Sequence, residues 1–134
     1  LGSGLFDEAG LRRAGVVTGV ATDVGGGTSY SMLQTLNEGY KVLQLRGQNL
    51  HPFAAFHWAT RGNAIALGMD AEIGQIAPGF AADLVVLDSK ATPAMALRGE
   101  RIETLAEELF LLQVMGDDRA VVQTYVAGQG MKPG

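Results

Sequence analysis

The chain has 134 residues, of which 47% are hydrophobic and 18% are charged, and its formal net charge is -4 at pH 7. This balance is typical of a folded globular protein and unlike that of a disordered segment. The ten basic residues are spread along the chain without a cluster of Lys and Arg, which argues against binding to nucleic acid or to an anionic membrane. There is no cysteine, so disulfides, thiolate nucleophiles and cysteine-ligated zinc are excluded.

The sequence favours a cytoplasmic location. Its apolar stretches are far shorter than the ~18 residues that suggest a membrane span, and no signal-peptide pattern is present. The first residue is Leu1 rather than Met, and a helical pattern follows almost at once. We therefore expect a cytoplasmic protein whose chain starts in the middle of a larger fold.

The first part of the chain predicts a helix, a strand and a second helix. Apolar residues at helical spacing predict a short helix over residues 5–14, which the glycine directly after it can end. Residues 16–22 are rich in β-branched residues and uncharged, as is typical of a strand covered on both faces in a parallel sheet. A longer helix is expected from about Met32, with Thr28 or Ser29 as its N-cap.

Two further helical pieces are expected before the middle of the chain. Pro52 suits the first turn of a helix over about residues 52–60, because proline lacks the N–H group that has no helical partner there. Gly62 and Asn63 then separate this helix from a shorter piece that ends near Gly68.

The second half of the chain predicts strands with one helix between them. Residues 73–79 are rich in turn formers, and residues 83–88 indicate a short strand bounded by acids. Thr104 and Glu107 fit a capping box that opens a helix. A last strand is expected over residues 121–126.

Asp23 is the strongest candidate for chemistry, because it follows the predicted strand directly. In a (β/α)8 barrel, catalytic side chains lie at the C-terminal ends of the parallel strands. The glycines at residues 25–27 allow the backbone to pass close to a ligand. The spacing alone also fits a plain Asp-x-Gly turn or an Asp that caps a helix, so these interpretations stay open at this point.

The residues around Asp23 resemble a family motif. The stretch Thr22–Leu33 is similar to the eighth-strand motif of amidohydrolase deaminases, and more narrowly of guanine deaminases. The resemblance covers nearly the whole chain and continues through residues 59–62, 66–68, 73–79 and 82–88. The last two of these motifs are superfamily-wide and do not choose a substrate. Two stretches are similar to guanine deaminases specifically, residues 116–119 and 124–128.

The resemblance implies an α/β fold made of two parts. Residues 1–69 would form the C-terminal part of a TIM-type (β/α)8 barrel, and residues 70–134 would supply strands of the small amidohydrolase β-sandwich with one intervening helix. The chain would then be the C-terminal fragment of a zinc-dependent guanine deaminase, an enzyme that hydrolyses guanine to xanthine and ammonia.

For Asp23 the resemblance implies two roles, zinc ligand and proton shuttle. A carboxylate has two oxygens, so one can bind Zn2+ while the other accepts a proton from the attacking water. The family's histidine ligands and its acid–base Glu would lie upstream of Leu1, as would the residues that grip the purine. No substrate-binding residue is therefore assigned, and we expect this chain alone to be inactive.

Two rival functions stay open, and several other residues are expected to have only structural roles. The parent could be a related deaminase or chlorohydrolase acting on another heterocycle, or the chain could be an interaction module without chemistry. His51 and His57 match no ligand of the family and are expected at a helix start and on a helix face. The glycine cluster lacks the ending of a P-loop, so phosphate binding is not expected. Asp117 and Arg119 are expected to form a local salt-bridged turn.

The expected partners are a small-molecule purine and another polypeptide. A sheet that lacks some of its strands has open edges, and an incomplete barrel exposes apolar faces. We therefore expect a homo-oligomer, or association with the missing N-terminal part of the parent. Neither nucleic acid nor membrane is an expected partner.

Overall fold

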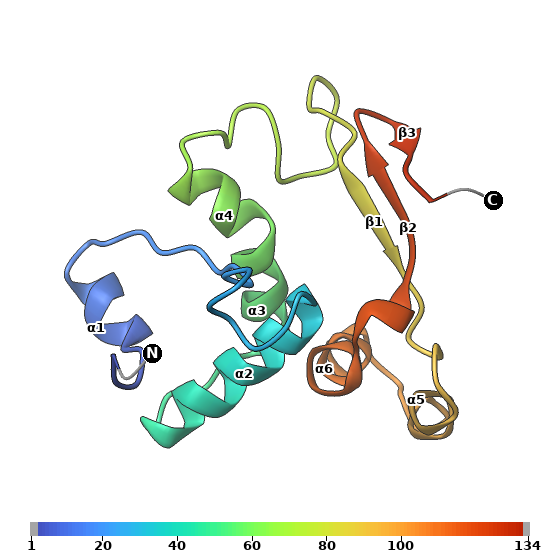
Figure 1. The fold of residues 1–134 in the computed structure, drawn as a ribbon, viewed down its shortest axis with the longest axis horizontal. Coiled ribbons are helices and arrows are strands. Elements are labelled where there is room, and N and C mark those ends of the chain that lie inside the picture. Colours follow the sequence, from blue (N-terminus) through green and yellow to red (C-terminus); the bar gives the residue numbers. More distant parts are fainter. Residues whose placement is uncertain (1–2, 133–134) are drawn as a thin grey trace.

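The structure is a computed structural model that describes residues 3–132, and it contains helices and one antiparallel sheet (Figure 1). The helices are α1 (Glu8–Arg13), α2 (Met32–Leu45), α3 (Pro52–Ala59), α4 (Arg61–Ala66), α5 (Pro93–Gly99), α6 (Leu105–Met115) and the 3-10 helix η1 (Asp118–Ala120). The strands are β1 (Leu84–Leu87), β2 (Val121–Val126) and β3 (Gln129–Gly130). Within residues 3–132, no helix has the length and apolar character needed to cross a bilayer.

Side-chain caps explain where the predicted helices begin. At α6 the Thr104 hydroxyl accepts a hydrogen bond from the Glu107 backbone, and the Glu107 carboxylate accepts one from the Thr104 backbone. At α3 the His51 ring accepts from the Phe53 backbone over 3.3 Å, and Pro52 lies in the first turn. Each bond satisfies a backbone N–H that has no helical acceptor. The expected capping box and the expected place of His51 are confirmed.

The break between α3 and α4 lies earlier than the sequence suggests. Thr60 has φ -122° and ψ -96°, outside the helical region, and its hydroxyl donates to the Phe56 carbonyl over 2.7 Å. Gly62 and Asn63 were expected to separate the two helices, but both lie inside α4. The break therefore places Asn63 on a helix, from which its side chain can reach another segment.

The predicted parallel strand over residues 16–22 is wrong for this structure. The segment is extended, but it carries no strand assignment. Its side chains are not covered on both faces, because Val16 is 48% exposed and Val17 is 60% exposed. A strand requires a neighbouring strand to pair its N–H and C=O groups, and none lies beside this segment within residues 3–132.

A second correction concerns the number of helices between β1 and β2. One intervening helix is predicted, whereas the structure has α5 and α6, followed by the single turn of η1. The sequence does contain a signal for α5, a threonine followed by a proline, which suit the N-cap and the first helical position. In the structure the Thr92 hydroxyl accepts from the Met95 backbone over 3.3 Å, and Pro93 takes the first helical position.

The sheet has the order β1-β2-β3, and all of its pairs are antiparallel. β1 pairs with β2 in a register that sets Val85 opposite Thr124, with an irregularity between Val86 and Leu87. Val85 and Val86 point to opposite faces because successive strand residues alternate, yet they are 56% and 45% exposed. Both faces of the sheet are therefore open at β1, which is also an edge strand.

Two apolar clusters hold the helices together, and α6 lies between α2 and α3 on one side and α5 on the other (Figure 1). The first cluster joins α2, α5 and α6, and its buried members are Leu33, Met95, Leu111, Leu112 and Ala120. The second joins α2 to α3 and contains Leu36, Leu43, Leu50 and Ala55. Helices from the first part of the chain thus share a core with α6, and a division of the chain after residue 69 stays a prediction.

Gln113 is the exception in this apolar core. Its side chain on α6 is completely buried, and within residues 3–132 neither its amide nitrogen nor its amide oxygen has a hydrogen-bond partner. A buried polar group without a partner costs about 1–3 kcal/mol, because its bonds to water are lost and not replaced.

Replacement of Gln113 by Met should therefore stabilise the protein by about 1 kcal/mol or more, since Met has a similar length and no polar amide. The thermal unfolding midpoint is the measurement. Gln44→Met, on the exposed side of α2, is the matched control and should change stability by less than about 0.5 kcal/mol. A lower midpoint for Gln113→Met would mean that the amide has a partner outside the described residues.

Candidate functional site

Asp23 lies at the start of a tight loop between the extended segment and α2. Its backbone has φ 50°, in the left-handed region, and its side chain is exposed. Its carbonyl oxygen accepts two hydrogen bonds, from the Gly26 N–H at 2.9 Å and the Gly27 N–H at 2.5 Å. The loop is therefore closed by the backbone of Asp23 itself, and the carboxylate is not used to close it.

The glycines are required by close contacts in this loop. A Cβ atom on Gly27 would lie 1.8 Å from the carbonyl oxygen of Thr22, which is backbone and cannot move aside alone. A Cβ atom on Gly26 would lie 2.7 Å from Oδ2 of Asp23. The first position tolerates no side chain without a backbone shift, whereas a side chain at the second would push against the carboxylate.

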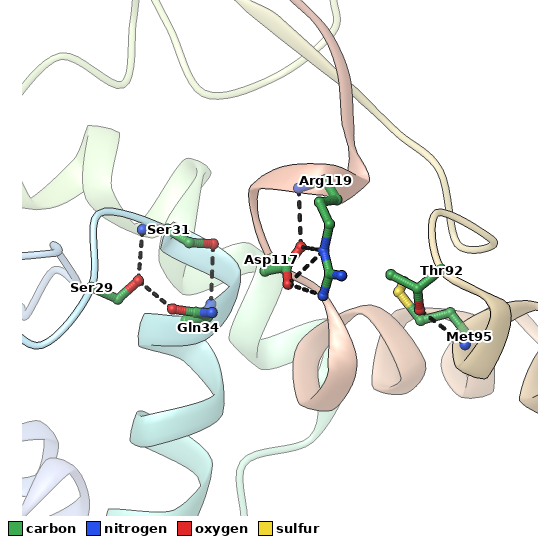
Figure 2. Close-up of polar contacts among 7 residues, drawn as sticks. All are labelled: Ser29, Ser31, Gln34, Thr92, Met95, Asp117 and Arg119. Atoms are coloured by element: carbon green, nitrogen blue, oxygen red, sulfur yellow. Dashed lines mark hydrogen bonds and ion pairs between the residues drawn. The ribbon is translucent and has the colours of Figure 1, made fainter.

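The loop ends at the N-terminus of α2, where three polar side chains form a small network (Figure 2). The Ser31 hydroxyl caps the helix by accepting from the Gln34 backbone over 3.4 Å. The Ser29 hydroxyl accepts from the Ser31 backbone over 2.9 Å and donates to Oε1 of Gln34 over 2.5 Å. The prediction that Thr28 or Ser29 is the N-cap is wrong, although Ser29 supports the residue that is.

Two side chains from the helices hold the extended segment that leads into the loop. The indole N–H of Trp58 on α3 donates to the Thr18 carbonyl over 3.0 Å. The Asn63 amide on α4 accepts from the Val20 N–H and donates to the Val20 carbonyl, each over 2.8 Å. Thr18, Val20 and Thr22 are half-buried while the residues between them are exposed, so one row of the segment faces the helices.

Asp23 offers a metal ion one hard oxygen ligand of the type that zinc accepts. Within residues 3–132 the carboxylate has no hydrogen-bond or ion-pair partner, and no group of three or more His, Asp or Glu residues could hold an ion. The donor chemistry of Asp23 fits zinc, but the described residues do not complete a site. His51 and His57 are not brought to it, since His51 caps α3 and His57 lies exposed on the same helix.

An open groove in the helical part of the chain lies away from Asp23. A groove of about 690 Å³ runs between α1, α3 and the start of the extended segment, and its lining includes Val16, Val17, Leu50 and Trp58. Asp23 is not among its lining residues. The groove is therefore an open apolar face of the helical part of the chain, separate from the candidate ligand.

Asp117 and Arg119 form the salt-bridged turn that the sequence predicts (Figure 2). The guanidinium donates to the carboxylate from Nε at 3.0 Å and from Nη2 at 2.5 Å. The hydrogen bonds from the Arg119 side chain, and then that from its backbone, hold the pKa of Asp117 below its ordinary value of 3.8. The pair connects α6 to β2 and has a structural role.

Sequence comparison assigns the chain to a family. The model of the amidohydrolase family matches residues 1–131. The chain belongs to the amidohydrolase family. This amidohydrolase chain is 47% identical over 129 residues to a guanine deaminase of Escherichia coli, a match that covers 96% of the chain and 29% of that relative. The resemblance to guanine deaminases found in the sequence is confirmed as a similarity.

Solved structures show the same likeness. The E. coli guanine deaminase structure matches with a TM-score of 0.94 at 46% identity, over 98% of this chain and 31% of that one. A guanine deaminase from Bradyrhizobium japonicum matches with a TM-score of 0.83 at 31% identity, over 98% of this chain and 35% of that one. An adenosine deaminase from Xanthomonas campestris, solved with bound zinc, shares the fold at a TM-score of 0.70 and 24% identity, with 90% and 26% covered. The chain thus spans about a third of the relatives that it matches.

Sequence reasoning did not reveal the residues that hold the segment before Asp23. Trp58 has no predicted role in the sequence analysis, and Asn63 was expected in a break between helices. Asn63 carries one weak signal, because Asn is a poor helix former and its presence inside a short helix indicates a use for its side chain.

Substitution of Gly27 by Ala should disrupt this loop, because the new methyl group would meet the Thr22 carbonyl oxygen at 1.8 Å. We expect a loss of stability of about 1–3 kcal/mol, the usual cost of overpacking, measured by thermal unfolding. Gly99→Ala is the control, since that position has open space around it and lies at the end of α5. Equal midpoints for the two variants would show that the loop adapts freely.

Proposed function

We propose that the protein containing this chain is a zinc-dependent guanine deaminase, which hydrolyses guanine to xanthine and ammonia. The observation that carries the proposal is the 47% identity to the E. coli guanine deaminase over 96% of the chain. It is supported by the overall match to the backbone of the E. coli guanine deaminase structure, with a TM-score of 0.94 over 98% of this chain. A related deaminase or chlorohydrolase for another heterocycle is the rival, since the residues that would grip the substrate are not part of this chain.

Asp23 is the zinc ligand and proton acceptor in this proposal. The bound metal would supply Lewis-acid chemistry and lower the pKa of a bound water. Asp23 would give the metal one carboxylate oxygen and take the proton of the attacking water on the other. The Asp23 carboxylate is exposed and has no partner in the part of the chain that the structure describes, and the loop is closed through backbone groups, which supports both roles.

The remaining ligands would come from the other two thirds of the parent protein. In the same proposal, residues 1–69 complete a TIM-type barrel and residues 70–134 complete a β-sandwich. Two features support this assembly. Only one row of the extended segment before Asp23 faces the helices, and both faces of the sheet are open at β1. A cytoplasmic location stays a prediction.

Asp23→Asn in the full-length protein should abolish guanine deamination, because the amide keeps the shape of the side chain but can neither accept the proton nor bind zinc as an anion. We expect a loss of at least about 100-fold in kcat/KM, the order of a general acid–base contribution, together with reduced zinc content. Asp118→Asn, an exposed acid in η1, is the control and should keep both.

The same experiment separates the rivals. If the wild type binds zinc but acts only on another heterocycle, that heterocycle replaces guanine as the proposed substrate. A full-length protein that binds no zinc and deaminates nothing would favour the interaction module. Full activity in Asp23→Asn would remove Asp23 from the mechanism.

We also propose that this chain is covered by further polypeptide, either the remainder of the parent or a second copy. Val17 in the groove and Val85 and Val122 on the sheet are each more than half exposed. Apolar surface of this kind, beside an open edge strand, favours association.

The 134-residue chain expressed alone should therefore self-associate, whereas co-expression with the rest of the parent should give a complex containing one copy of each part. Light scattering coupled to size exclusion measures both masses. A monodisperse monomer of the isolated chain at low micromolar concentration would contradict the proposal.

A further inference from the structure

We propose that Asn63 is a positioning residue for Asp23, and that its side-chain amide sets the place of the carboxylate and through it the zinc affinity of the site. The inference rests on the proposed role of Asp23 as a zinc ligand. Asn63 itself is outside the loop, and the hydrogen bonds of its side chain within the described residues go to Val20 and Ala59.

The Asn63 amide pairs with both backbone groups of Val20, and its Nδ2 also donates to the Ala59 carbonyl over 3.4 Å. Its Oδ1 accepts from the Val20 N–H and its Nδ2 donates to the Val20 carbonyl, both over 2.8 Å. Paired bonds to both backbone groups of one residue are what a neighbouring antiparallel strand would provide. A Cβ atom on Gly19 would lie 2.5 Å from the Asn63 Oδ1, so this glycine permits the close approach.

Among the described residues, the Asn63 bonds are the last side-chain hydrogen bonds from the helices to the segment before Asp23. Trp58 bonds Thr18, two residues earlier in the same half-buried row. Between Val20 and Asp23, no further side-chain hydrogen bond fixes the segment within the described residues. Asn63 therefore holds the chain three residues ahead of the candidate ligand, a span of at most about 10 Å.

The loop beyond this point is closed by its own backbone bonds and is attached at two ends. The Asp23 carbonyl closes it through Gly26 and Gly27, the Ser31 cap joins it to α2, and the extended segment leads into it. A loop closed in this way tends to move as a unit when one of its two attachments loosens. Loss of the Asn63 bonds would therefore shift the Asp23 carboxylate relative to ligands supplied by the rest of the protein.

Both amide groups are needed for this contact, which suggests two substitutions. Asn63→Leu has a similar shape and makes neither bond. Asn63→Asp can accept from the Val20 N–H but cannot donate to the Val20 carbonyl, and it places two acceptors in contact. Asn37 supplies a matched control, because its Nδ2 donates to the Val114 carbonyl over 3.2 Å and joins α2 to α6, not to the extended segment before Asp23.

The experiment measures zinc affinity by chelator competition, together with thermal unfolding and guanine deamination, in the full-length protein. Asn63→Leu and Asn63→Asp should each weaken zinc binding about 10- to 100-fold, the usual effect of losing a residue that orients a metal ligand. Asn37→Leu should lower the unfolding midpoint about as much as the two Asn63 variants do. Its zinc affinity should stay within about twofold of the wild type.

These measurements distinguish a failure of the positioning role of Asn63 from a failure of the proposed function. If the wild type binds zinc but does not deaminate guanine, the function is wrong while the affinities still test Asn63. Unchanged zinc affinity in both Asn63 variants overturns the positioning role. Equal loss in Asn37→Leu also overturns it, since the effect would then be one of general stability. A wild type that binds no zinc overturns both proposals.

Discussion

The candidate site depends on the paired hydrogen bonds between the Asn63 amide and the backbone of Val20. An extended segment has N–H and C=O groups that need partners, and each one left buried without a partner costs about 1–3 kcal/mol. Here the side chain of Asn63 provides the hydrogen-bond partners for the N–H and C=O of one residue, Val20. A neighbouring strand would provide such partners for every second residue. The approach to Asp23 is thus fixed to α4, although no parallel strand lies beside it within residues 3–132.

From that anchor the geometry of the loop follows from backbone chemistry. The left-handed conformation of Asp23 turns its carbonyl toward Gly26 and Gly27, and a Cβ atom on Gly27 would strike the Thr22 carbonyl. The carboxylate is left out of these bonds. A side chain that does not stabilise the loop is available to a ligand, which is why the site is argued from Asp23 and not from the histidines.

The sequence predicted those features whose causes are local. The capping box at Thr104, the proline at the start of α3 and the turn at Asp117 each involve residues within a few positions, and all three are confirmed. The choice of Asp23 as a candidate also rests on a local pattern, an acid before a glycine cluster, and its role stays a prediction. The contact of Asn63 with Val20 spans 43 positions and leaves no periodic signal, so the sequence could not reveal it. The strand over residues 16–22 failed because a strand is defined by partners that a single segment does not contain.

Three deficits in the described chain have one explanation under the proposed function. Asp23 offers one ligand where a metal needs about four, Val85 and Val86 leave both faces of the sheet open, and Val17 leaves the groove beside α3 uncovered. The relatives are about three times as long as this chain, so the proposed parent would have enough polypeptide to meet all three needs. Val20 of the extended segment packs against the second apolar cluster and Leu87 of β1 packs against the first, while α2 contributes to both. Under the proposed function, the polypeptide that covers these exposed surfaces would also bring the missing ligands to Asp23.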